Sequence, residues 1–539
     1  MTDFFRMRFL AKLVSGLLTV VAAGQLCAAG KASHVVVIVW DGMRPDFVRE
    51  DLTPALWNLA QGGVTFKNHH PVYISTTEVN GTALATGLYP QESGIIGNKE
   101  FRPSLDPAQA VHTESLAVIR KADSLSGNHY LAAPTVAELL HVKGLRTAIA
   151  GSKEVALLHD RGERGDDALG LEIYGGNCLP QSLAAKLGEQ LGPFPPVAHS
   201  TTNWDKWTAS ALTQIMWEKE PPPFSLLWMS EPDHSQHETA PGSPMSFAAI
   251  RHNDEILAHV LAAIEQRRVR DETDVFVVSD HGFSSIQEMC DVQAALINQG
   301  IHASRKVPPQ GVSDGDVLLV SNGSTVFLYV TGHNEGLIEK TVHCLQAQPF
   351  CGVVFTRKPV EGAFRLEDAR INSPSAPDIV MALRWNPKMS TNGAPGMVVS
   401  DYGTYGPGGG THGSLSPYDM HNTCIAAGPD FKKGIQDYLP TGNIDIAPTI
   451  LWLLGVEPPQ PRSGRVLHEA LNSSRQTTVS FEPHHLEATY RGGDFVWRQY
   501  LNYSEVAGVV YFDEGNGAKT PVTTPGPITN KAGHSQNSR

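Results

Sequence analysis

Three short runs of apolar residues stand out in the first half of the chain, and each ends in polar or acidic residues. They read HVVVIVWD at 34–41, PFSLLWMSE at 223–231 and TDVFVVSD at 273–280. A strand buried on both faces shows no polar alternation, so such runs are typical of central strands in a parallel sheet. Ligands of such sheets bind beyond the carboxyl ends of the strands. We therefore expect the acids that end these runs, Asp41, Glu231 and Asp280, to converge on one edge.

Helical patterns lie between these runs. Apolar residues recur at helical spacing in 54–61, 135–142 and 245–266. Strands that alternate with helices predict an α/β fold, in which a central, mostly parallel sheet has helices on both faces.

The organisation changes after residue 290. Residues 290–400 mix Gly, Pro and Ser with short β-like runs, which we interpret as an α+β cap inserted into the core, and the tail from residue 516 is rich in Gly, Pro, Thr and Asn. Such a composition predicts disorder. The expected parts are a first core segment 34–289, the cap 290–400, a second core segment 401–470, a β-rich extension 471–515 and a disordered tail 516–539.

The first 29 residues have the pattern of an export signal. Basic residues come first, at Arg6, Arg8 and Lys12, and an apolar or small stretch follows at 13–24. That stretch is too short to span a bilayer, and the small residues after it suit a signal peptidase. We predict a signal peptide at 1–29 and an exported protein, periplasmic or secreted, without a membrane span in the mature chain. The alternative is an uncleaved anchor.

Composition and charge narrow the classes of function. The chain has 539 residues, of which 41% are hydrophobic and 18% charged, as in ordinary globular proteins. Its net charge of −13 argues against a nucleic-acid-binding surface, which needs a basic face. A phosphate-containing substrate remains compatible with this charge, because bound metal ions would invert the local field.

The cysteines do not form a disulfide scaffold. Beyond the expected signal peptide they number five, at Cys178, Cys290, Cys344, Cys351 and Cys424. Cys344 and Cys351 are close enough in sequence for one bridge, and the odd count leaves at least one free thiol. Without a Cys-x-x-Cys pair, a thiolate zinc site is disfavoured.

Seven residues could form two adjacent metal sites. They are Asp41, Thr77, Asp233, His237, Asp280, His281 and His412. Carboxylate oxygen and imidazole nitrogen are ligands for zinc-like ions, although manganese or iron would also fit. Two such ions about 4 Å apart clamp an in-line phosphoryl displacement. Each motif alone could instead be a turn residue or a polar surface residue.

The order of these motifs resembles the type I phosphodiesterase/nucleotide pyrophosphatase family of the alkaline phosphatase superfamily. The segments that match are Asp41-Gly-Met-Arg-Pro45, Thr77-Glu-Val-Asn80, Thr86-Gly-Leu-Tyr-Pro90, Gly94-Ile-Ile-Gly-Asn98, Glu231-Pro-Asp-His-Ser-Gln-His237, Ser279-Asp-His-Gly282 and Thr411-His-Gly413. The resemblance covers about 34–470. It implies an alkaline-phosphatase-like sandwich with a cap, and hydrolysis of a small-molecule phosphoester, a diester or nucleotide pyrophosphate, through a phospho-threonine.

The resemblance also implies roles for the individual residues. It implies two zinc ions, one held by Asp233, His237 and His412. The other would be held by Asp41, Asp280 and His281, with Thr77 approaching it as the nucleophile.

Three neighbouring residues with hydroxyl groups are candidates for the nucleophile. Ser75 and Thr76 precede Thr77, so the residues alone leave three candidates, and the spacing to the matching segments selects Thr77. A threonine here could also be a helix N-cap, which is compatible with catalysis.

Asn98 is expected to donate a hydrogen bond to a phosphoryl oxygen in the transition state. Its alternative interpretation is a turn residue.

The sequence departs from the family at two places. Glu78 and Val79 stand where many members have Phe-Pro, and Lys153 lies in the region that often holds Trp-Pro-Gly. In related phosphomonoesterases and phosphonoacetate hydrolases a lysine in a similar segment neutralises extra substrate charge. We therefore expect Lys153 to bind substrate, and a solvated surface lysine is the alternative.

Other functions stay open to different degrees. A phosphomonoesterase or phosphonate hydrolase could use the same site. A sulfatase is disfavoured because no Cys-x-Pro-x-Arg segment is present. A non-catalytic binding protein of the same fold is also disfavoured, because all six ligand positions are filled.

Overall fold

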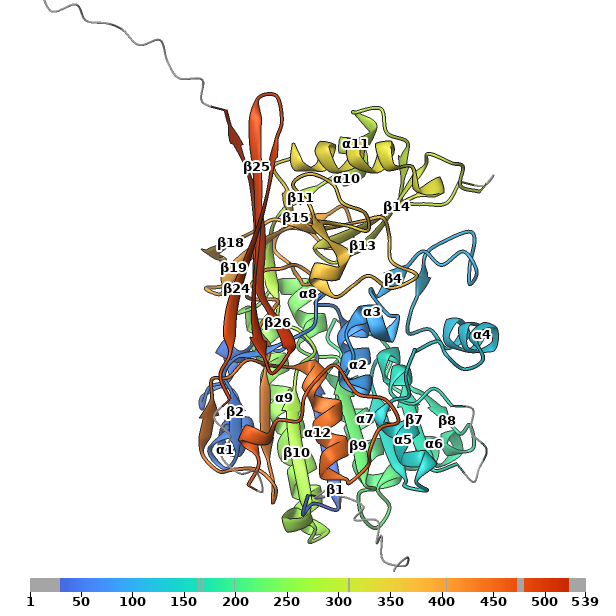
Figure 1. Cartoon of the computed structure of the whole chain (residues 1–539). Helices are drawn as coiled ribbons and strands as arrows, with labels where there is room; N and C mark the ends of the chain where they lie inside the picture. Colours follow the sequence, from blue (N-terminus) through green and yellow to red (C-terminus); the bar gives the residue numbers. More distant parts are fainter. Residues whose placement is uncertain are drawn as a thin grey trace, which may run out of the picture.

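The scaffold is a nine-stranded sheet (Figure 1). The computed structural model describes residues 30–522 apart from 163–164, 166–167, 198, 309–310, 404 and 473–478. The predicted signal peptide and most of the predicted tail lie outside these residues. The strand order is β22 (Ile435–Asp437), β2 (Val64–Phe66), β21 (Cys424–Ala427), β10 (Thr273–Val278), β1 (His34–Trp40), β9 (Phe224–Met229), β6 (Thr147–Gly151), β7 (Gly170–Tyr174) and β8 (Asn177–Leu179).

The three apolar runs are neighbouring central strands, as predicted. β1 pairs in parallel with β10 on one side and β9 on the other, and β9 pairs in parallel with β6. Val39 lies opposite Val278, and Trp40 lies opposite Met229. Since all four strands run in one direction and end at similar levels, the residues that follow them meet at one edge of the sheet.

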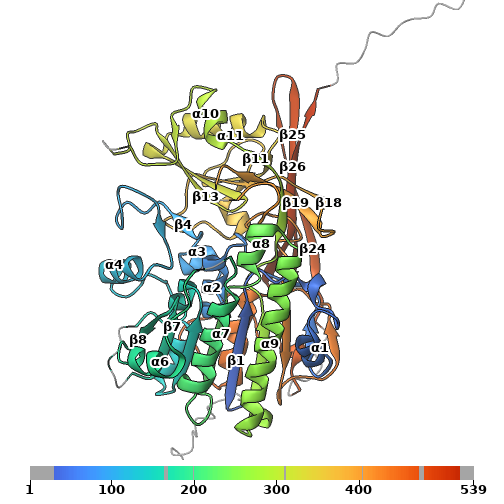
Figure 2. The same cartoon turned by 180° about the vertical axis from the view of Figure 1, so that it is seen from behind.

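Helices cover both faces of this sheet. Along β1 the side chains alternate, so Val35, Val37 and Val39 enter one hydrophobic core while Val36 and Ile38 enter the other. The first core is covered by α2 (Thr77–Thr86), α5 (Val136–Val142) and α12 (Ile446–Leu453) (Figure 1). The second is covered by α1 (Pro54–Gln61), α7 (Thr202–Ser210) and α9 (Pro244–Gln266) (Figure 2). This confirms the α/β fold.

Four further helices lie in the described part of the core. They are α3 (Pro90–Ser93), α4 (Leu116–Ser126), α6 (Leu183–Leu191) and α8 (Asp233–Thr239). Among the residues that the structure describes, no helix combines the length and the apolar character needed to cross a bilayer.

The cap has its own sheet and its own hydrophobic core. The strand order is β12 (Ala303–Ser304), β13 (Val317–Asn322), β14 (Thr325–Val330), β17 (Ile379–Leu383), β15 (Cys351–Thr356) and β16 (Phe364–Arg365). Helices α10 (Val292–Ile297) and α11 (Glu335–Gln346) contribute to this core. A four-stranded sheet, β18 (Trp385–Met389), β19 (Pro395–Asp401), β11 (Ser284–Cys290) and β20 (Gly410–Thr411), leads from the cap to the core.

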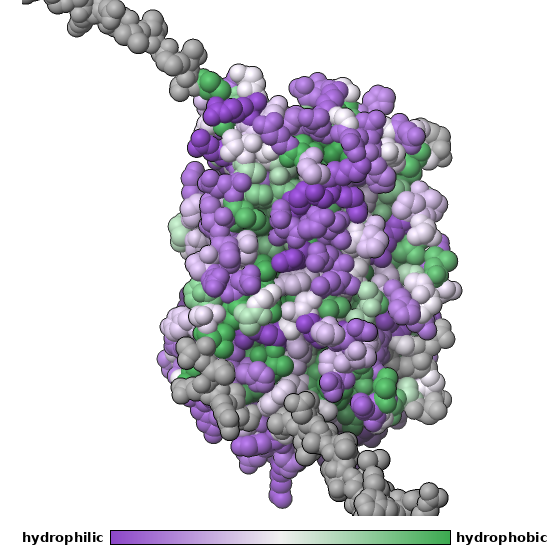
Figure 3. Space-filling view, viewed as in Figure 1, coloured by the Kyte–Doolittle hydropathy of each residue, from purple (hydrophilic) through white to green (hydrophobic). Residues whose placement is uncertain are grey.

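The C-terminal extension is a long three-stranded sheet that lies against both parts (Figure 1). It consists of β24 (Glu482–Arg491), β25 (Phe495–Val506) and β26 (Val509–Pro521). Trp497 enters the core of the cap, and Leu501 enters the main core. Polar side chains predominate on the exposed face of the molecule that includes this sheet (Figure 3).

Two expectations from the sequence need correction. The ordered chain passes residue 515, because β25 supplies the backbone partners of β26 as far as the pair Phe495–Pro521. The possible bridge between Cys344 and Cys351 does not form, and all five described cysteines are free. The Cys344 thiol points instead toward the Ala295 carbonyl oxygen in α10, at 3.7 Å.

Candidate active site

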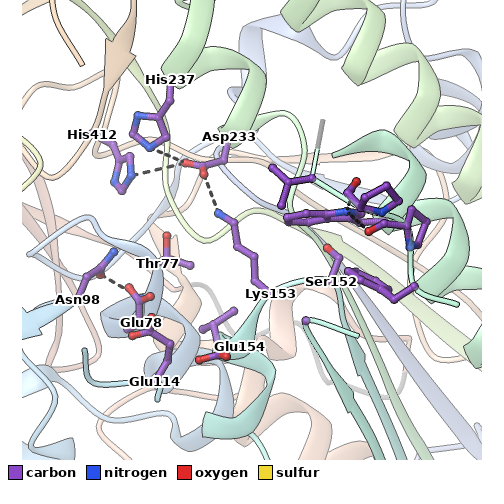
Figure 4. A pocket seen from close by; sticks show the side chains of 17 residues that line it. Thr77, Glu78, Asn98, Glu114, Ser152, Lys153, Glu154, Asp233, His237 and His412 are labelled. Atoms are coloured by element: carbon purple, nitrogen blue, oxygen red, sulfur yellow. Dashed lines mark hydrogen bonds and ion pairs between the residues drawn. The ribbon is translucent and has the colours of Figure 1, made fainter. Parts of the chain in front are cut away.

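Four neighbouring strand ends supply charged side chains to one cluster. Asp41 follows β1, Asp233 begins α8 after β9, Asp280 and His281 follow β10, and Lys153 follows β6. Lys153, Asp233, His237 and His412 line a cavity of about 620 Å³ beside this cluster, and Figure 4 shows Lys153 and Asp233 pointing toward each other in it. His237 comes from α8 and His412 follows β20. The six predicted ligand residues therefore converge.

The three imidazoles are held in one tautomer. Each Nδ1 lies at hydrogen-bonding distance from a backbone carbonyl oxygen: His237 from Gly410 at 2.9 Å, His281 from Gly282 at 2.8 Å and His412 from Ser75 at 2.9 Å. A carbonyl only accepts, so each Nδ1 carries the proton and each Nε2 presents a lone pair. This is the usual arrangement of metal-binding histidines.

All three carboxylates have one oxygen fixed by donors of the protein. Asp41 Oδ2 accepts hydrogen bonds from Lys153 Nζ at 2.8 Å and from Trp228 Nε1 at 3.0 Å. Asp280 Oδ1 accepts from the Gly42 backbone N–H at 3.0 Å. Gly42 has φ +69°, a conformation that favours glycine, and it turns its N–H toward Asp280 directly after the strand.

Asp233, the third carboxylate, also has one oxygen held by a donor. Asp233 Oδ2 accepts from Lys153 Nζ at 2.6 Å. The second oxygens, namely Asp41 Oδ1, Asp233 Oδ1 and Asp280 Oδ2, are buried and have no hydrogen-bond donor. They face the imidazole lone pairs instead, at 3.3 Å from Asp233 to His237, 3.5 Å from Asp233 to His412, 3.1 Å from Asp280 to His281 and 3.5 Å from Asp41 to His281.

These residues fit bound cations. Acceptor atoms that face each other in a buried site repel unless a positive charge lies between them. Burial and the charge of Asp280 raise the pKa of Asp41 to about 8, and burial raises the pKa of Asp280 to about 7. Ligand atoms of Asp41, Asp280 and His281 lie within 4.8 Å of one another, as do those of Asp233, His281 and His412. His237 adjoins the second group through Asp233.

Of the three candidate hydroxyls, that of Thr77 lies at hydrogen-bonding distance from this cluster. Its Oγ1 lies 3.3 Å from His281 Nε2. The Ser75 hydroxyl donates to the Ser414 carbonyl at 3.0 Å and is thereby turned to another partner. Thr76, not Thr77, is the N-cap of α2, so the N-cap interpretation of Thr77 was wrong by one residue.

Asn98 and Lys153 also line the cavity. Asn98 Oδ1 accepts from the Glu78 backbone N–H at 3.3 Å, which leaves the amide NH₂ free to donate, on the side of Thr77 (Figure 4). Lys153 Nζ is paired with both Asp41 and Asp233, so the alternative of a solvated surface lysine was wrong. Although burial opposes it, the charges of Asp233 and Asp41 hold the pKa of Lys153 well above its ordinary value.

Sequence reasoning missed a group of acids in the same cavity. Glu78, Glu114 and Glu154 line it, together with the aromatic residues Phe194 and Trp204. Glu78 and Glu114 each have a buried oxygen without a donor. Burial and the charge of Glu114 raise the pKa of Glu78 well above its ordinary value. The adjacency of Glu78 to Thr77 was visible in the sequence, but its burial beside Glu114 was not.

The fold and the site together define the class of protein. A mostly parallel sheet between two helical layers, with acids and imidazoles at the carboxyl ends of its central strands, is the architecture of the alkaline phosphatase superfamily, as predicted. Residues 35–414 match the family described as type I phosphodiesterase/nucleotide pyrophosphatase. The chain belongs to this family, whose members are phosphoric ester hydrolases.

Individual relatives are distant but cover most of the chain. Human ectonucleotide pyrophosphatase/phosphodiesterase family member 7 is 22% identical over 81% of this chain and 83% of its own, and the rat protein is 23% identical over 85% and 91%. The solved structure of murine ectonucleotide pyrophosphatase/phosphodiesterase 5 superimposes with a TM-score of 0.58 at 18% identity, covering 81% of this chain and 100% of its own. The last likeness shows the fold.

Proposed function

We propose that the protein hydrolyses phosphodiesters or nucleotide pyrophosphates, and that Thr77 attacks phosphorus. The observation behind this proposal is the Thr77 hydroxyl, 3.3 Å from His281 Nε2 at the edge of a cluster that fits two cations. A solved structure of murine ectonucleotide pyrophosphatase/phosphodiesterase 5 is an inactive threonine-to-alanine variant in complex with AMP. That description supports a threonine nucleophile in a nucleotide-binding site of the same fold.

Two zinc-type ions fit the residues at the strand ends. Asp233, His237 and His412 would hold one, and Asp41, Asp280 and His281 would hold the other, beside Thr77. When bound, such ions polarise phosphoryl oxygens and lower the pKa of a coordinated hydroxyl.

Residues of the chain carry out the two steps of hydrolysis. The Thr77 hydroxyl gives its proton to solvent, and Oγ1 forms a bond to phosphorus as the bond to the leaving oxygen breaks, which gives a phospho-threonine. The leaving oxygen takes up a proton from solvent. Water then breaks the bond between Thr77 and phosphorus and frees the enzyme. Asn98 donates its free N–H to a non-bridging oxygen, where negative charge develops in the transition state. His281, held by Gly282, lies next to the attacking hydroxyl.

The charges around the cavity favour a diester over a monoester. A monoester brings a second negative charge, which the carboxylates of Glu114 and Glu154 at the cavity would repel. Lys153 does not offset them, because its ammonium is already paired with Asp41 and Asp233. A phosphomonoesterase or phosphonate hydrolase is the second candidate, because Lys153 lines the cavity and would neutralise a second charge if the substrate displaced one of its two carboxylate partners.

A substrate panel tests this choice. Purified mature protein should hydrolyse aryl diesters and dinucleotides with a kcat/KM at least about tenfold above that for aryl monoesters and carboxylated phosphonates, a difference of about 1.4 kcal/mol. The reverse ranking would favour the monoesterase or phosphonatase. Absence of turnover for the whole panel in metal-loaded protein would favour a binding protein.

A substitution of Lys153 separates positioning from substrate binding. Lys153→Met should lower diester turnover by about 10- to 150-fold, because charge-assisted hydrogen bonds of about 1.5–3 kcal/mol orient Asp41 and Asp233. Lys143→Met, at the exposed end of α5, is the control for loss of a charge and should keep wild-type rates. A Lys153→Met variant with wild-type diester turnover and slower monoester turnover would show that Lys153 contacts the substrate.

Export is part of the same proposal. The basic and apolar segments within residues 1–29 support a signal peptide, and the names of the similar proteins include the prefix "ecto". Mass spectrometry of the mature N-terminus would test cleavage near residue 29.

A further inference from the structure

A second cluster of imidazole and carboxylate groups lies where the C-terminal sheet meets the core. It consists of His70, His421 and Asp513, and one ligand atom from each lies within 4.8 Å of the others. His70 belongs to β3 (His69–His70), which pairs with β23 (Thr441–Gly442), and Asp513 belongs to β26. His421 lies in the loop between β20 and β21. Three segments that are distant in sequence thus meet at one point.

Both imidazoles have the same fixed tautomer as those of the active site. His70 Nδ1 lies 3.0 Å from the Thr441 carbonyl oxygen, and His421 Nδ1 lies 3.0 Å from the Pro417 carbonyl oxygen. Each Nδ1 therefore donates, and each Nε2 presents a lone pair. The two rings lie close together, with centroids 4.5 Å apart.

The carboxylate repeats the pattern of the active-site acids. Asp513 Oδ1 lies 3.1 Å from His70 Nε2, and Oδ2 accepts from the Ser504 hydroxyl at 3.0 Å. One oxygen is thus fixed by a donor of the protein while the other faces an imidazole lone pair. The acids Asp41, Asp233 and Asp280 show the same division.

A β-bulge aims Asp513 at the two histidines. In the pairing of β25 with β26, Asn502 lies opposite Glu514 and Tyr503 lies opposite Phe512, so Asp513 is the extra residue without a partner. A bulge turns a side chain out of the regular alternation of a strand, and bulges are common beside functional sites. The bulge accounts for the direction of this carboxylate.

A simple ion pair between protonated His70 and Asp513 would explain only part of the cluster. It would leave His421 outside the pair, although its ring lies 4.5 Å from that of His70. The Nε2 of this ring lies 3.1 Å from the side-chain oxygen of Asn68, which is a further acceptor. A cation accounts for both imidazoles and for the carboxylate together.

We propose that His70 Nε2, His421 Nε2 and Asp513 bind one zinc-type divalent ion at a third site, separate from the proposed active site. Two imidazole nitrogens and one carboxylate oxygen suit zinc, and three protein ligands leave a fourth coordination position open. His421 and Asp513 line a cavity of about 640 Å³, which supplies the access that an ion and its remaining ligand need. The ion would join the core to the C-terminal sheet.

Metal content of the full mature protein tests the proposal. Wild type and Asp513→Asn are loaded with Zn²⁺, freed of excess ions by gel filtration, and measured by inductively coupled plasma mass spectrometry. We expect Asp513→Asn to hold one zinc ion per chain fewer than wild type. This difference does not depend on how many ions the active site holds, so failure of the proposed function would not change it.

Matched variants exclude other causes of a difference in zinc content. Glu514→Gln removes a carboxylate from the same cavity without touching the cluster, so it should bind as much zinc as wild type. His421→Gln should lose the same single ion as Asp513→Asn, which keeps the test valid if one variant fails to fold. Equal zinc content in wild type and in the folded cluster variants would overturn the proposal. So would an equal loss in Glu514→Gln, because it would indicate non-specific binding.

Discussion

Replacing Thr77 by alanine should lower diester turnover by about 10³-fold or more, while the fold and the metal content stay unchanged. The hydroxyl is the only part of the side chain that the reaction needs, and it lies 3.3 Å from His281 Nε2. Steady-state kinetics at saturating substrate measure the loss. Thr77→Ser should retain part of the activity, because it keeps the hydroxyl.

A neighbouring threonine provides the control. Thr76 is buried beside Thr77, and its hydroxyl makes no hydrogen bond among the described residues. Thr76→Val keeps the shape of the side chain and should stay within about threefold of wild type, since single substitutions away from a reacting group cost little. Wild-type turnover in Thr77→Ala, or a large loss in Thr76→Val alone, would assign the nucleophile elsewhere.

Removing the metal ions should lower turnover by a factor similar to that for Thr77→Ala. Dialysis against a chelator should reduce turnover by about 10³-fold or more, and added Zn²⁺ should restore it, because phosphoryl transfer relies on charge stabilisation by the ions. Without cations the unpaired oxygens of Asp41, Asp233 and Asp280 have no positive partner but a proton. Asp280→Ala should reproduce the loss and lower the bound zinc.

The same strand offers a control for this substitution. Asp274 lies on β10, at the end opposite to Asp280, and is also buried. Asp274→Asn should keep wild-type zinc content and turnover. Full activity of the chelator-treated protein, verified as metal-free, would contradict the two-ion account.

The sequence predicted the acids of the site best. Asp41 and Asp280 could be placed at one edge because buried parallel strands end together, and β1 and β10 do pair in parallel. His412 could be included only through the resemblance, since a histidine among glycines has no pattern of its own. Its position depends on the short strand β20, which pairs with β11 after the whole cap has been inserted.

The remaining features depend on tertiary contacts that no local pattern encodes. Lys153 could bind substrate or lie in solvent as far as the sequence shows, and only the packing of β6 beside β9 brings it between Asp41 and Asp233. Glu114 comes from a loop outside the matched motifs. The end of β26 could not be predicted, because its Gly- and Thr-rich residues are ordered by the partner strand β25.

The most direct test of the account is to trap the covalent intermediate. Protein mixed with a dinucleotide substrate and quenched with acid within one turnover should contain a nucleoside monophosphate attached to the peptide that includes Thr77, as read by tandem mass spectrometry. The adduct should be absent from Thr77→Ala. An adduct on Ser75 or Thr76, or single-turnover hydrolysis without any adduct and with inversion of configuration at phosphorus, would contradict attack by Thr77.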